Sequence, residues 1–191
     1  MIQLIGPGGA GKTTAGLALA NRLGIPFIDL DEQFRVRVGD ISDCLKVHGY
    51  PSYARQNIQV YVDTLGTFSE DAVLALSSGF MTYGIDAHPA YGDICRDIVA
   101  NPLTVVLLPS FDYETCVTET VRRQLRRPFR RSAQREEQVI RARFDVYSGL
   151  PTKKFETTMR INLLVDQLVT HLLPNIRLQP TAAGAIMDRR G

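Results

Sequence analysis

A glycine-rich segment near the start of the chain constrains the fold more than any other feature. Residues 6–13 read GPGGAGKT and match G-x-x-x-x-G-K-[ST], the pattern of a phosphate-binding loop. Glycines let successive backbone N–H groups turn inward around a phosphate, because no Cβ stands in the way. We expect the loop and the turn after it to bind the phosphates of a nucleotide through Gly9, Ala10, Gly11, Lys12, Thr13 and Thr14.

Two side chains of this segment carry its chemistry. Lys12 brings an ammonium group to the β- and γ-phosphate oxygens, and Thr13 offers a hydroxyl to Mg²⁺. A helix that begins here also directs the positive end of its dipole at the same anion. The segment therefore predicts a site for a nucleoside triphosphate, which we take to be ATP, together with Mg²⁺.

The sequence on either side of the loop fits this prediction. Residues 2–5 form a short, mostly apolar run of the kind that makes a buried strand. After the loop, apolar residues recur with helical spacing from Ala15 to Leu23, and Gly24 is placed to end that helix. Strand, glycine loop and helix follow in the order that a phosphate-binding loop requires.

Apolar runs and helical patterns alternate along the rest of the chain. Further strands are predicted at 27–28, 73–76, 104–108 and 154–157. Helices are predicted at 15–23, 30–38, 52–66, 88–100, 112–125, 134–147 and 161–173, with Ser52 and Asp112 as candidate N-caps. The alternation predicts an α/β protein, a P-loop NTPase whose five-stranded parallel sheet has helices on both faces. We expect one domain over residues 1–174 and a disordered tail over 175–191.

The composition argues against several other classes of protein. No apolar run approaches the ~20 residues that a membrane span needs, and we find no pattern of a signal peptide. Cys44, Cys95 and Cys116 are widely spaced, and the three histidines are equally scattered. We therefore expect a cytoplasmic protein, a monomer that contacts no membrane and has neither a disulfide framework nor a zinc site.

Arginines are concentrated in one segment, although the net charge of the chain is only +2. The cluster consists of Arg122, Arg123, Arg126, Arg127, Arg130 and Arg131. Such a cluster indicates an anionic partner or a solvated face. These guanidinium groups exceed what one triphosphate needs, so we expect one or two to act there and the others to face solvent. The segment lacks interleaved aromatic residues apart from Phe129, which disfavours nucleic acid as the partner.

A pair of acidic residues follows the predicted second strand. Ligands of parallel sheets lie beyond the carboxyl ends of the strands, so Asp29 and Asp31 are expected to face the phosphate site. Residues two apart on an extended segment point the same way, which would bring both carboxylates into one cleft. One could hold a metal-bound water while the other accepts a proton from an attacking hydroxyl. Spacing alone equally allows a structural role, in which either residue caps the helix that begins near Leu30.

Two later arginines suit the capture of an anionic substrate. A guanidinium group binds carboxylate or phosphate in a planar, bidentate way and keeps its charge. Arg143 lies one helical turn before Tyr147, so both are expected to face one cleft. For Arg143 and for Arg55, a solvated surface position is the alternative.

These motifs together resemble the shikimate kinase family of small P-loop kinases over about residues 1–173. The likeness consists of GPGGAGKTT, then FIDLD, Tyr53-Ala54-Arg55, Leu76-Ser77-Ser78-Gly79, Arg126-Arg127-Pro128-Phe129 and Arg143-Phe144-Asp145-Val146-Tyr147. The resemblance implies ATP-dependent phosphorylation of a hydroxyl on a small carboxylate-bearing metabolite. The implied reaction converts shikimate to shikimate 3-phosphate.

The resemblance also implies roles for individual residues. Asp29 would contact Mg²⁺ through water, next to the hydroxyl that the loop supplies. Asp31 would bind and activate the acceptor hydroxyl. Arg55 and Arg143 would hold the substrate carboxylate, while Gly79 would contact the substrate through its backbone.

Catalysis would then depend on Lys12, Asp31 and Arg127. Arg127 lies in a basic lid over residues 122–133 and would reach over the ATP phosphates, and closure of the lid would exclude water.

The chain departs from the family pattern in three places. The family usually has three glycines where this chain has Ser77-Ser78-Gly79. Its Phe-Arg pair corresponds here to Tyr53-Ala54-Arg55, which is one residue out of register, and Ile58 replaces the glutamate that usually follows that arginine. These changes do not affect the prediction that the chain binds ATP. They concern the residues that would bind the acceptor, and so its identity.

Two other readings of the sequence stay open. One is a P-loop kinase for a different acceptor, such as gluconate or a nucleoside monophosphate. The paired acids after the second strand suit a hydroxyl acceptor better than a phosphate. The other is a nucleotide-dependent switch, for which we would expect a guanine-specificity motif such as N-K-x-D, and we find none.

Overall fold

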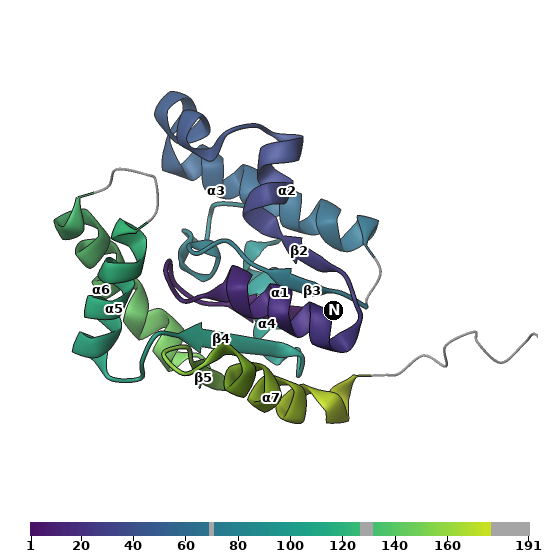
Figure 1. Ribbon diagram of the computed structural model, residues 1–191. Helices are drawn as coiled ribbons and strands as arrows, with labels where there is room; N and C mark the ends of the chain where they lie inside the picture. The colour runs from purple at the N-terminus through teal and green to yellow at the C-terminus, as the bar shows by residue number, and fades with distance from the viewer. Residues whose placement is uncertain (69–70, 127–131, 177–191) are drawn as a thin grey trace, which may run out of the picture.

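A computed structural model of the protein describes residues 1–68, 71–126 and 132–176. Its centre is a five-stranded sheet in the order β2-β3-β1-β4-β5, and every neighbouring pair is parallel (Figure 1). The strands are β1 (Ile2–Ile5), β2 (Phe27–Asp29), β3 (Val73–Ala75), β4 (Thr104–Leu108) and β5 (Lys154–Glu156). The predicted fold class is confirmed, including the short strand at Phe27.

Seven helices and two short 3₁₀ turns lie along the described ranges. They are α1 (Lys12–Leu23), α2 (Leu30–Arg37), α3 (Ile41–Thr67), η1 (Phe80–Thr82), α4 (Tyr91–Ala100), α5 (Tyr113–Leu125), α6 (Ala133–Gly149), α7 (Ile161–Leu172) and η2 (Leu173–Asn175). Each predicted helix is present. Gly24 ends α1 in the left-handed conformation with φ 68°, and Asp112 caps α5 by accepting from the Thr115 N–H at 2.9 Å.

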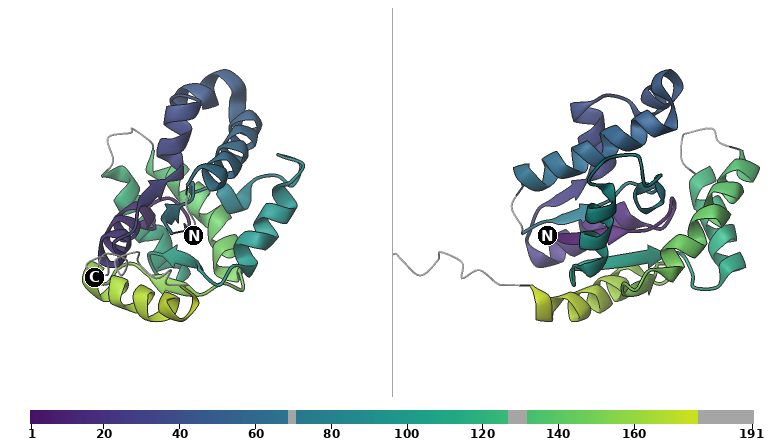
Figure 2. Two further views of the ribbon diagram at one scale, coloured as in Figure 1. Left: turned by 90° about the vertical axis from the view of Figure 1, so that its right-hand side faces the viewer. Right: turned by 180° about the vertical axis from the view of Figure 1, so that it is seen from behind.

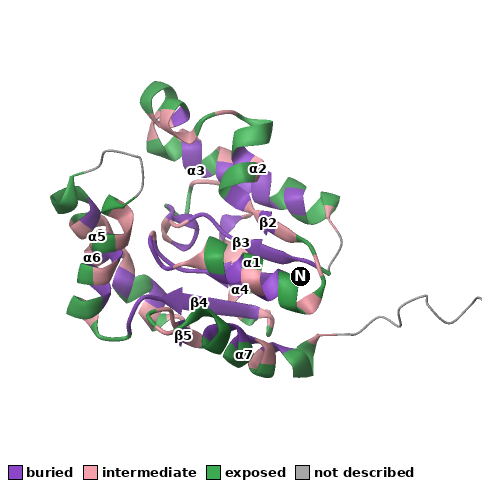
Figure 3. Ribbon diagram, in the orientation of Figure 1, coloured by how far each residue is buried: buried purple, intermediate pink, exposed green. Residues whose placement is uncertain are grey.

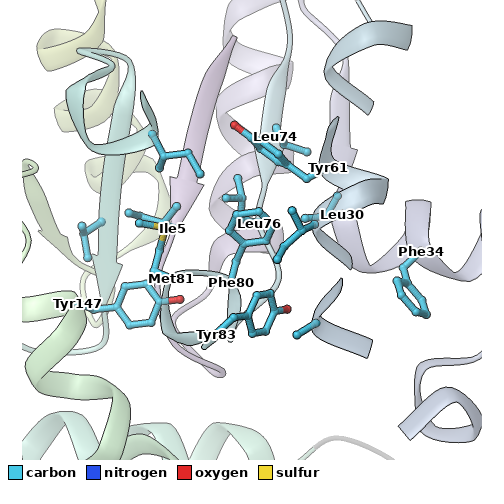
Figure 4. Packing of buried hydrophobic residues seen from close by; sticks show 14 of the residues in the cluster. Ile5, Leu30, Phe34, Tyr61, Leu74, Leu76, Phe80, Met81, Tyr83 and Tyr147 are labelled. Carbon is cyan, nitrogen blue, oxygen red and sulfur yellow. The ribbon is translucent and has the colours of Figure 1, made fainter. Parts of the chain in front are cut away.

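The two faces of the sheet bury separate apolar clusters, because alternate residues of a strand point to opposite faces. Leu4 lies in the cluster that α1 and α7 cover, whereas the next residue, Ile5, lies in the cluster that includes residues of α3, α4 and α6. On the second face, Phe80 packs against Tyr61 with ring centroids 4.9 Å apart (Figure 4). The strands are therefore buried on both sides, and exposed residues concentrate on the outer surfaces of the helices (Figure 3).

Helix α3 contains a break that the sequence analysis did not predict. Its first turn is capped by Asp40, whose side chain accepts from the N–H groups of Ser42 and Asp43. Gly49 then leaves the helical conformation with φ 75° and ψ 172°. The helix resumes before Ser52, so the predicted N-cap at Ser52 is wrong. Its hydroxyl instead accepts a hydrogen bond from the Gln56 side chain at 3.1 Å.

The carboxyl ends of the strands share one edge with the phosphate loop. Helices α5 and α6 stand side by side beyond this edge, and the broken part of α3 lies across from them (Figures 1 and 2). The elements expected to form a site are thus gathered at one end of the sheet.

The described chain extends slightly past the expected end of the domain. Ile176 packs against the apolar cluster under α7, and the rest of the predicted tail, 177–191, lies outside the described residues. Among the helices that the structure describes, none combines the length and the apolar character needed to cross a membrane.

Candidate active site

The phosphate loop joins β1 to α1 and has the conformation that its glycines permit. Gly9 and Gly11 adopt φ values of 74° and 84°, which side-chain-bearing residues rarely adopt. Gly11 directly precedes α1, so the loop ends at the positive pole of that helix. The Lys12 ammonium folds back over the loop and donates to the carbonyl oxygens of Gly6 at 2.6 Å and Pro7 at 3.0 Å.

Arg123 on α5, a member of the arginine cluster, binds the phosphate loop. Its guanidinium donates to the Gly9 carbonyl at 3.1 Å and to both the hydroxyl and the carbonyl of Thr157, at 2.8 and 3.0 Å. Glu119 binds Arg122 and Arg123, and this pairing lowers the pKa of the Glu119 carboxyl to about 2. Arg127, the residue of this cluster that was predicted to reach the phosphates, lies outside the described residues.

A pocket of about 380 Å³ opens beside the loop on the Arg123 side. Backbone of Gly9 and Gly11 forms one wall, and apolar side chains that include Met159 and Leu164 form another. Its volume falls within the usual range of small-molecule sites, about 300–1,000 Å³. Polar loop backbone on one side and apolar surface on the other suit the phosphates and the base of a nucleotide, respectively.

Asp29 has two contacts that correspond to the two roles considered for it. One carboxylate oxygen accepts from the Asp31 N–H at 3.0 Å, so Asp29 is the N-cap of α2. The other oxygen accepts from the Thr13 hydroxyl at 2.9 Å. A structural role for Asp29 is therefore confirmed, and it places the carboxylate beside the loop hydroxyl at the same time.

Thr13 and Asp29 form the part of the site that could hold Mg²⁺. Mg²⁺ is bound through one or two carboxylates, substrate phosphates and waters, so this donor set fits the ion. Across the described part of the chain there is no cluster of three or more His, Cys, Asp or Glu side chains with metal-binding geometry. A metal here would accordingly draw most of its ligands from nucleotide and water.

Asp31 lies in the first turn of α2 and does not cap it. It is exposed, and one carboxylate oxygen accepts from the Ser77 hydroxyl at 2.5 Å. Ser77 follows β3, the neighbour of β2, so the carboxyl ends of two adjacent strands bring these residues together. Asp31 was expected on an extended segment with Asp29. That expectation was wrong, because the helix begins at Leu30, although both carboxylates do lie at one edge of the sheet.

Arg143 on α6 reaches the segment after β3. Its guanidinium donates to the Ser78 hydroxyl at 3.2 Å and to the Tyr50 hydroxyl at 3.4 Å. Tyr147, one turn later, is buried and donates to the Ser78 carbonyl at 3.0 Å, so both side chains contact Ser78, and the prediction that they face one cleft stays a prediction. Arg143 and Gly8 line one small cavity of about 20 Å³, so Arg143 lies next to the phosphate loop.

Gly79 lies against the same two side chains. A Cβ added there would come within 2.8 Å of the Arg143 guanidinium and of the Tyr50 hydroxyl. Its φ of −98° is open to any residue, so close approach, and not backbone conformation, requires glycine at this position.

Arg55 is not brought to this group of residues. Tyr53 and Asn57 face the core from the second part of α3, and Arg55 lies two positions from each, on the opposite side of the helix. The side chain is exposed and makes no hydrogen bond or ion pair among the residues that the structure describes. The structure instead places Tyr50 beside Arg143, and Tyr50 was missed in the sequence because it follows the helix break.

The fold and the site together define a P-loop NTPase. Comparisons with known proteins narrow this class. A sequence profile described as shikimate kinase matches residues 8–173. The chain therefore belongs to the shikimate kinase family, a family of ATP-dependent kinases.

Individual relatives agree with this assignment. The shikimate kinase of Shewanella loihica is 33% identical over 128 residues, which cover 66% of this chain and 67% of that protein. A segment of the pentafunctional AROM polypeptide of Schizosaccharomyces japonicus is 34% identical over 81 residues, 42% of this chain but only 5% of that polypeptide. Shikimate kinase from Acinetobacter baumannii, solved in complex with shikimate, superposes with a TM-score of 0.67 at 24% identity, covering 92% of this chain and 94% of that one. This last likeness shows the shared fold.

Proposed function

We propose that this protein transfers the γ-phosphoryl group of ATP to a hydroxyl of shikimate and produces shikimate 3-phosphate. One observation carries the proposal: two consecutive serines bring a carboxylate and a guanidinium together beside the phosphate loop. Ser77 binds Asp31, and Ser78 binds Arg143. A hydroxy acid can bridge these two groups, with its hydroxyl at Asp31 and its carboxylate at Arg143. The name of the family supplies the particular acceptor.

The residues around the phosphates are assigned to charge neutralisation and positioning. In-line transfer spreads negative charge over the γ-phosphoryl oxygens, so fixed cations beside them lower the barrier. Lys12 is the described candidate, because its ammonium already lies over the loop. Arg127 stays a prediction as a second cation. When Mg²⁺ is bound at Thr13 and Asp29, it adds charge neutralisation at the β- and γ-oxygens.

The acceptor is assigned to the residues around Ser77 and Ser78, at the same end of the sheet as the phosphate loop. Asp31 orients the attacking hydroxyl and accepts its proton, while Arg143 holds the carboxylate and Gly79 allows the substrate to approach the backbone. The role of Arg55 stays a prediction, and its position on the outer side of α3 favours Arg143 as the principal carboxylate-binding residue.

A coupled assay of ADP release tests the proposal. Purified protein, ATP and Mg²⁺ are assayed with shikimate, and in parallel with gluconate, nucleoside monophosphates and no acceptor. Formation of ADP that requires shikimate, together with shikimate 3-phosphate identified by mass spectrometry, is the expected result. ADP release that depends on a different acceptor would show that shikimate is not the acceptor and would leave the kinase assignment in place. Equal release without any acceptor would refute both.

The same preparation tests the remaining assignments. Omission of Mg²⁺ should abolish turnover, because the negative charge on the phosphate oxygens would then lack the neutralisation that the metal supplies. We further propose that the protein acts as a monomer on small molecules in the cytoplasm, which size-exclusion chromatography with light scattering and cell fractionation would examine.

A further inference from the structure

A chain of hydrogen bonds runs from the core to Asp31. The Tyr83 hydroxyl donates to the side-chain carbonyl of Asn57 at 2.9 Å, and the Asn57 amide nitrogen donates to the Ser77 hydroxyl oxygen at 3.0 Å. Ser77 in turn donates to Asp31 at 2.5 Å. Four elements of the fold therefore meet in one continuous path, since these residues come from the segment after η1, from α3, from the end of β3 and from α2.

Every donor in this path points toward the carboxylate. A hydroxyl has a single hydrogen, and the Ser77 oxygen already accepts from Asn57, so its hydrogen is committed to Asp31. Burial raises the pKa of the Tyr83 phenol well above its usual value, so this hydroxyl stays protonated and remains a donor at neutral pH. Each of the three hydrogen bonds is thus donated toward Asp31. The Tyr53 hydroxyl lies beside the path, where it also interacts with Tyr83 and Ser77.

Three residues of the path are buried, whereas Asp31, at its end, is exposed. Asn57, Ser77 and Tyr83 have exposed fractions of 0%, 2% and 7%. Asp31 is exposed in the first turn of a helix, where an aspartate side chain samples several rotamers. A donor held by buried partners restricts that sampling, because hydrogen bonds that polarise one another are stronger in a buried setting.

We propose that Ser77, Asn57 and Tyr83 are positioning residues that fix the carboxylate of Asp31 for the acceptor hydroxyl. The inference rests on the proposed function, in which Asp31 orients that hydroxyl and accepts its proton. The path does not carry the proton away. It holds one carboxylate oxygen in place, so that the charge is directed at the substrate before the substrate binds.

A double-mutant cycle tests the coupling between the two ends of the path. Ser77→Ala should lower kcat by about 10- to 100-fold, the scale of loss when a reacting group is misplaced by up to about 1 Å. The KM for ATP should not change, because the phosphate loop is untouched. Tyr83→Phe should lower kcat by a smaller factor in the parent and by no further factor in the Ser77→Ala background. Equal effects of Tyr83→Phe in both backgrounds would overturn the proposal.

Tyr61→Phe is the matched control for loss of a buried phenol hydroxyl. Tyr61 also lies in the core, and it donates to Gln3 at 3.2 Å, away from Asp31. Both tyrosine variants should lose some thermal stability, because each leaves a buried partner without its donor. Only Tyr83→Phe should lower kcat. If both variants lowered kcat to the same extent, the effect would be structural and the positioning role would be refuted.

Asp31→Asn and crystal structures separate this inference from the proposed function. Full activity of Asp31→Asn would refute the role of Asp31 itself. An inactive Asp31→Asn beside a fully active Ser77→Ala would refute the positioning role alone. Crystal structures of the parent and of Ser77→Ala test the positioning role without measuring activity. We expect one Asp31 conformer in the parent and several in the variant. The same single conformer in both would contradict the proposal.

Discussion

Gly79→Ala tests the inferred acceptor site with the smallest possible change. The added methyl group would come within 2.8 Å of both the Arg143 guanidinium and the Tyr50 hydroxyl, where ordinary contact begins at 3.4 Å. Each group would have to retreat by about 0.6 Å. Since a misplacement of about 1 Å can cost about 100-fold in rate, we expect kcat/KM for shikimate to fall about 10- to 100-fold.

The same change should leave the fold and the nucleotide site intact. Gly79 has φ −98°, which alanine adopts without strain, and the two nearest groups are the ends of the Arg143 and Tyr50 side chains. The buried Tyr83 ring, at 3.2 Å, would have to shift by only about 0.2 Å. The melting temperature and the KM for ATP should therefore stay close to those of the parent. Steady-state kinetics with each substrate varied in turn, together with thermal melts, measure both effects.

Gly66→Ala is the matched control for this experiment. Gly66 lies near the end of α3, and an added Cβ would meet no atom within 4 Å. Alanine in a helix is favoured over glycine by about 0.5–1 kcal/mol, so this variant should be at least as stable as the parent and equally active. If Gly79→Ala retained the parent's kinetics for shikimate, the assignment of Arg143 and Tyr50 to the acceptor site would be refuted.

Four further predictions concern single side chains. Lys12→Ala should reduce kcat by about 100-fold or more without loss of stability, because it removes a charge from the transferring group and no core volume; more than a tenth of the parent's activity would contradict the role. Asp31→Asn should bind ATP normally and lose about 100- to 10,000-fold in kcat, which near-full turnover of shikimate would disprove. Arg143→Ala should raise the KM for shikimate far more than Arg55→Ala, and kinetics in which Arg55 matters more would reverse the assignment. Glu119→Gln should lower the free energy of unfolding at pH 7 by at most about 3 kcal/mol, since one unit of pKa shift corresponds to about 1.4 kcal/mol. The Glu119 carboxyl has its pKa lowered to about 2, so this contribution is complete above the usual value of 4.5 and is lost as the pH falls toward 2. Urea denaturation of the parent and of Glu119→Gln at several pH values measures this contribution. A difference in the free energy of unfolding that persists near pH 2 would contradict the role of the Glu119 charge.

The sheet and most of the helices could be predicted from the sequence because their signals are local. The run at 104–108 is short, apolar and rich in β-branched residues, as buried strands are, and the glycines of the phosphate loop have one well-known geometry. The first part of α3 was missed because Gly49 and Pro51 interrupt the helical pattern, so a break inside one helix was interpreted as its beginning.

The long-range contacts of the site could not be predicted in the same way. Arg123 and Gly9 are 114 positions apart, and no local pattern distinguishes Arg123 from the other arginines of its cluster. The two serines after β3 were seen only as departures from glycine. Their roles as partners of Asp31 and Arg143 depend on which strands are neighbours, and a single sequence does not contain that information.

The break at Gly49 separates Tyr50, a residue of the proposed acceptor site, from the partly exposed segment that precedes it in α3. Tyr53 and Asn57 are anchored in the core, whereas Tyr50 stands directly after the break, at the end of a segment whose residues 46–48 are exposed. The Tyr50 ring packs against Tyr53 and Tyr83, with centroids 6.0 and 5.8 Å away, so a change in the outer segment would reach the Tyr50 hydroxyl only by shifting this contact. If the proposed acceptor site is right, changes before the break that shift this contact would alter acceptor preference and leave the phosphate loop unchanged in sequence.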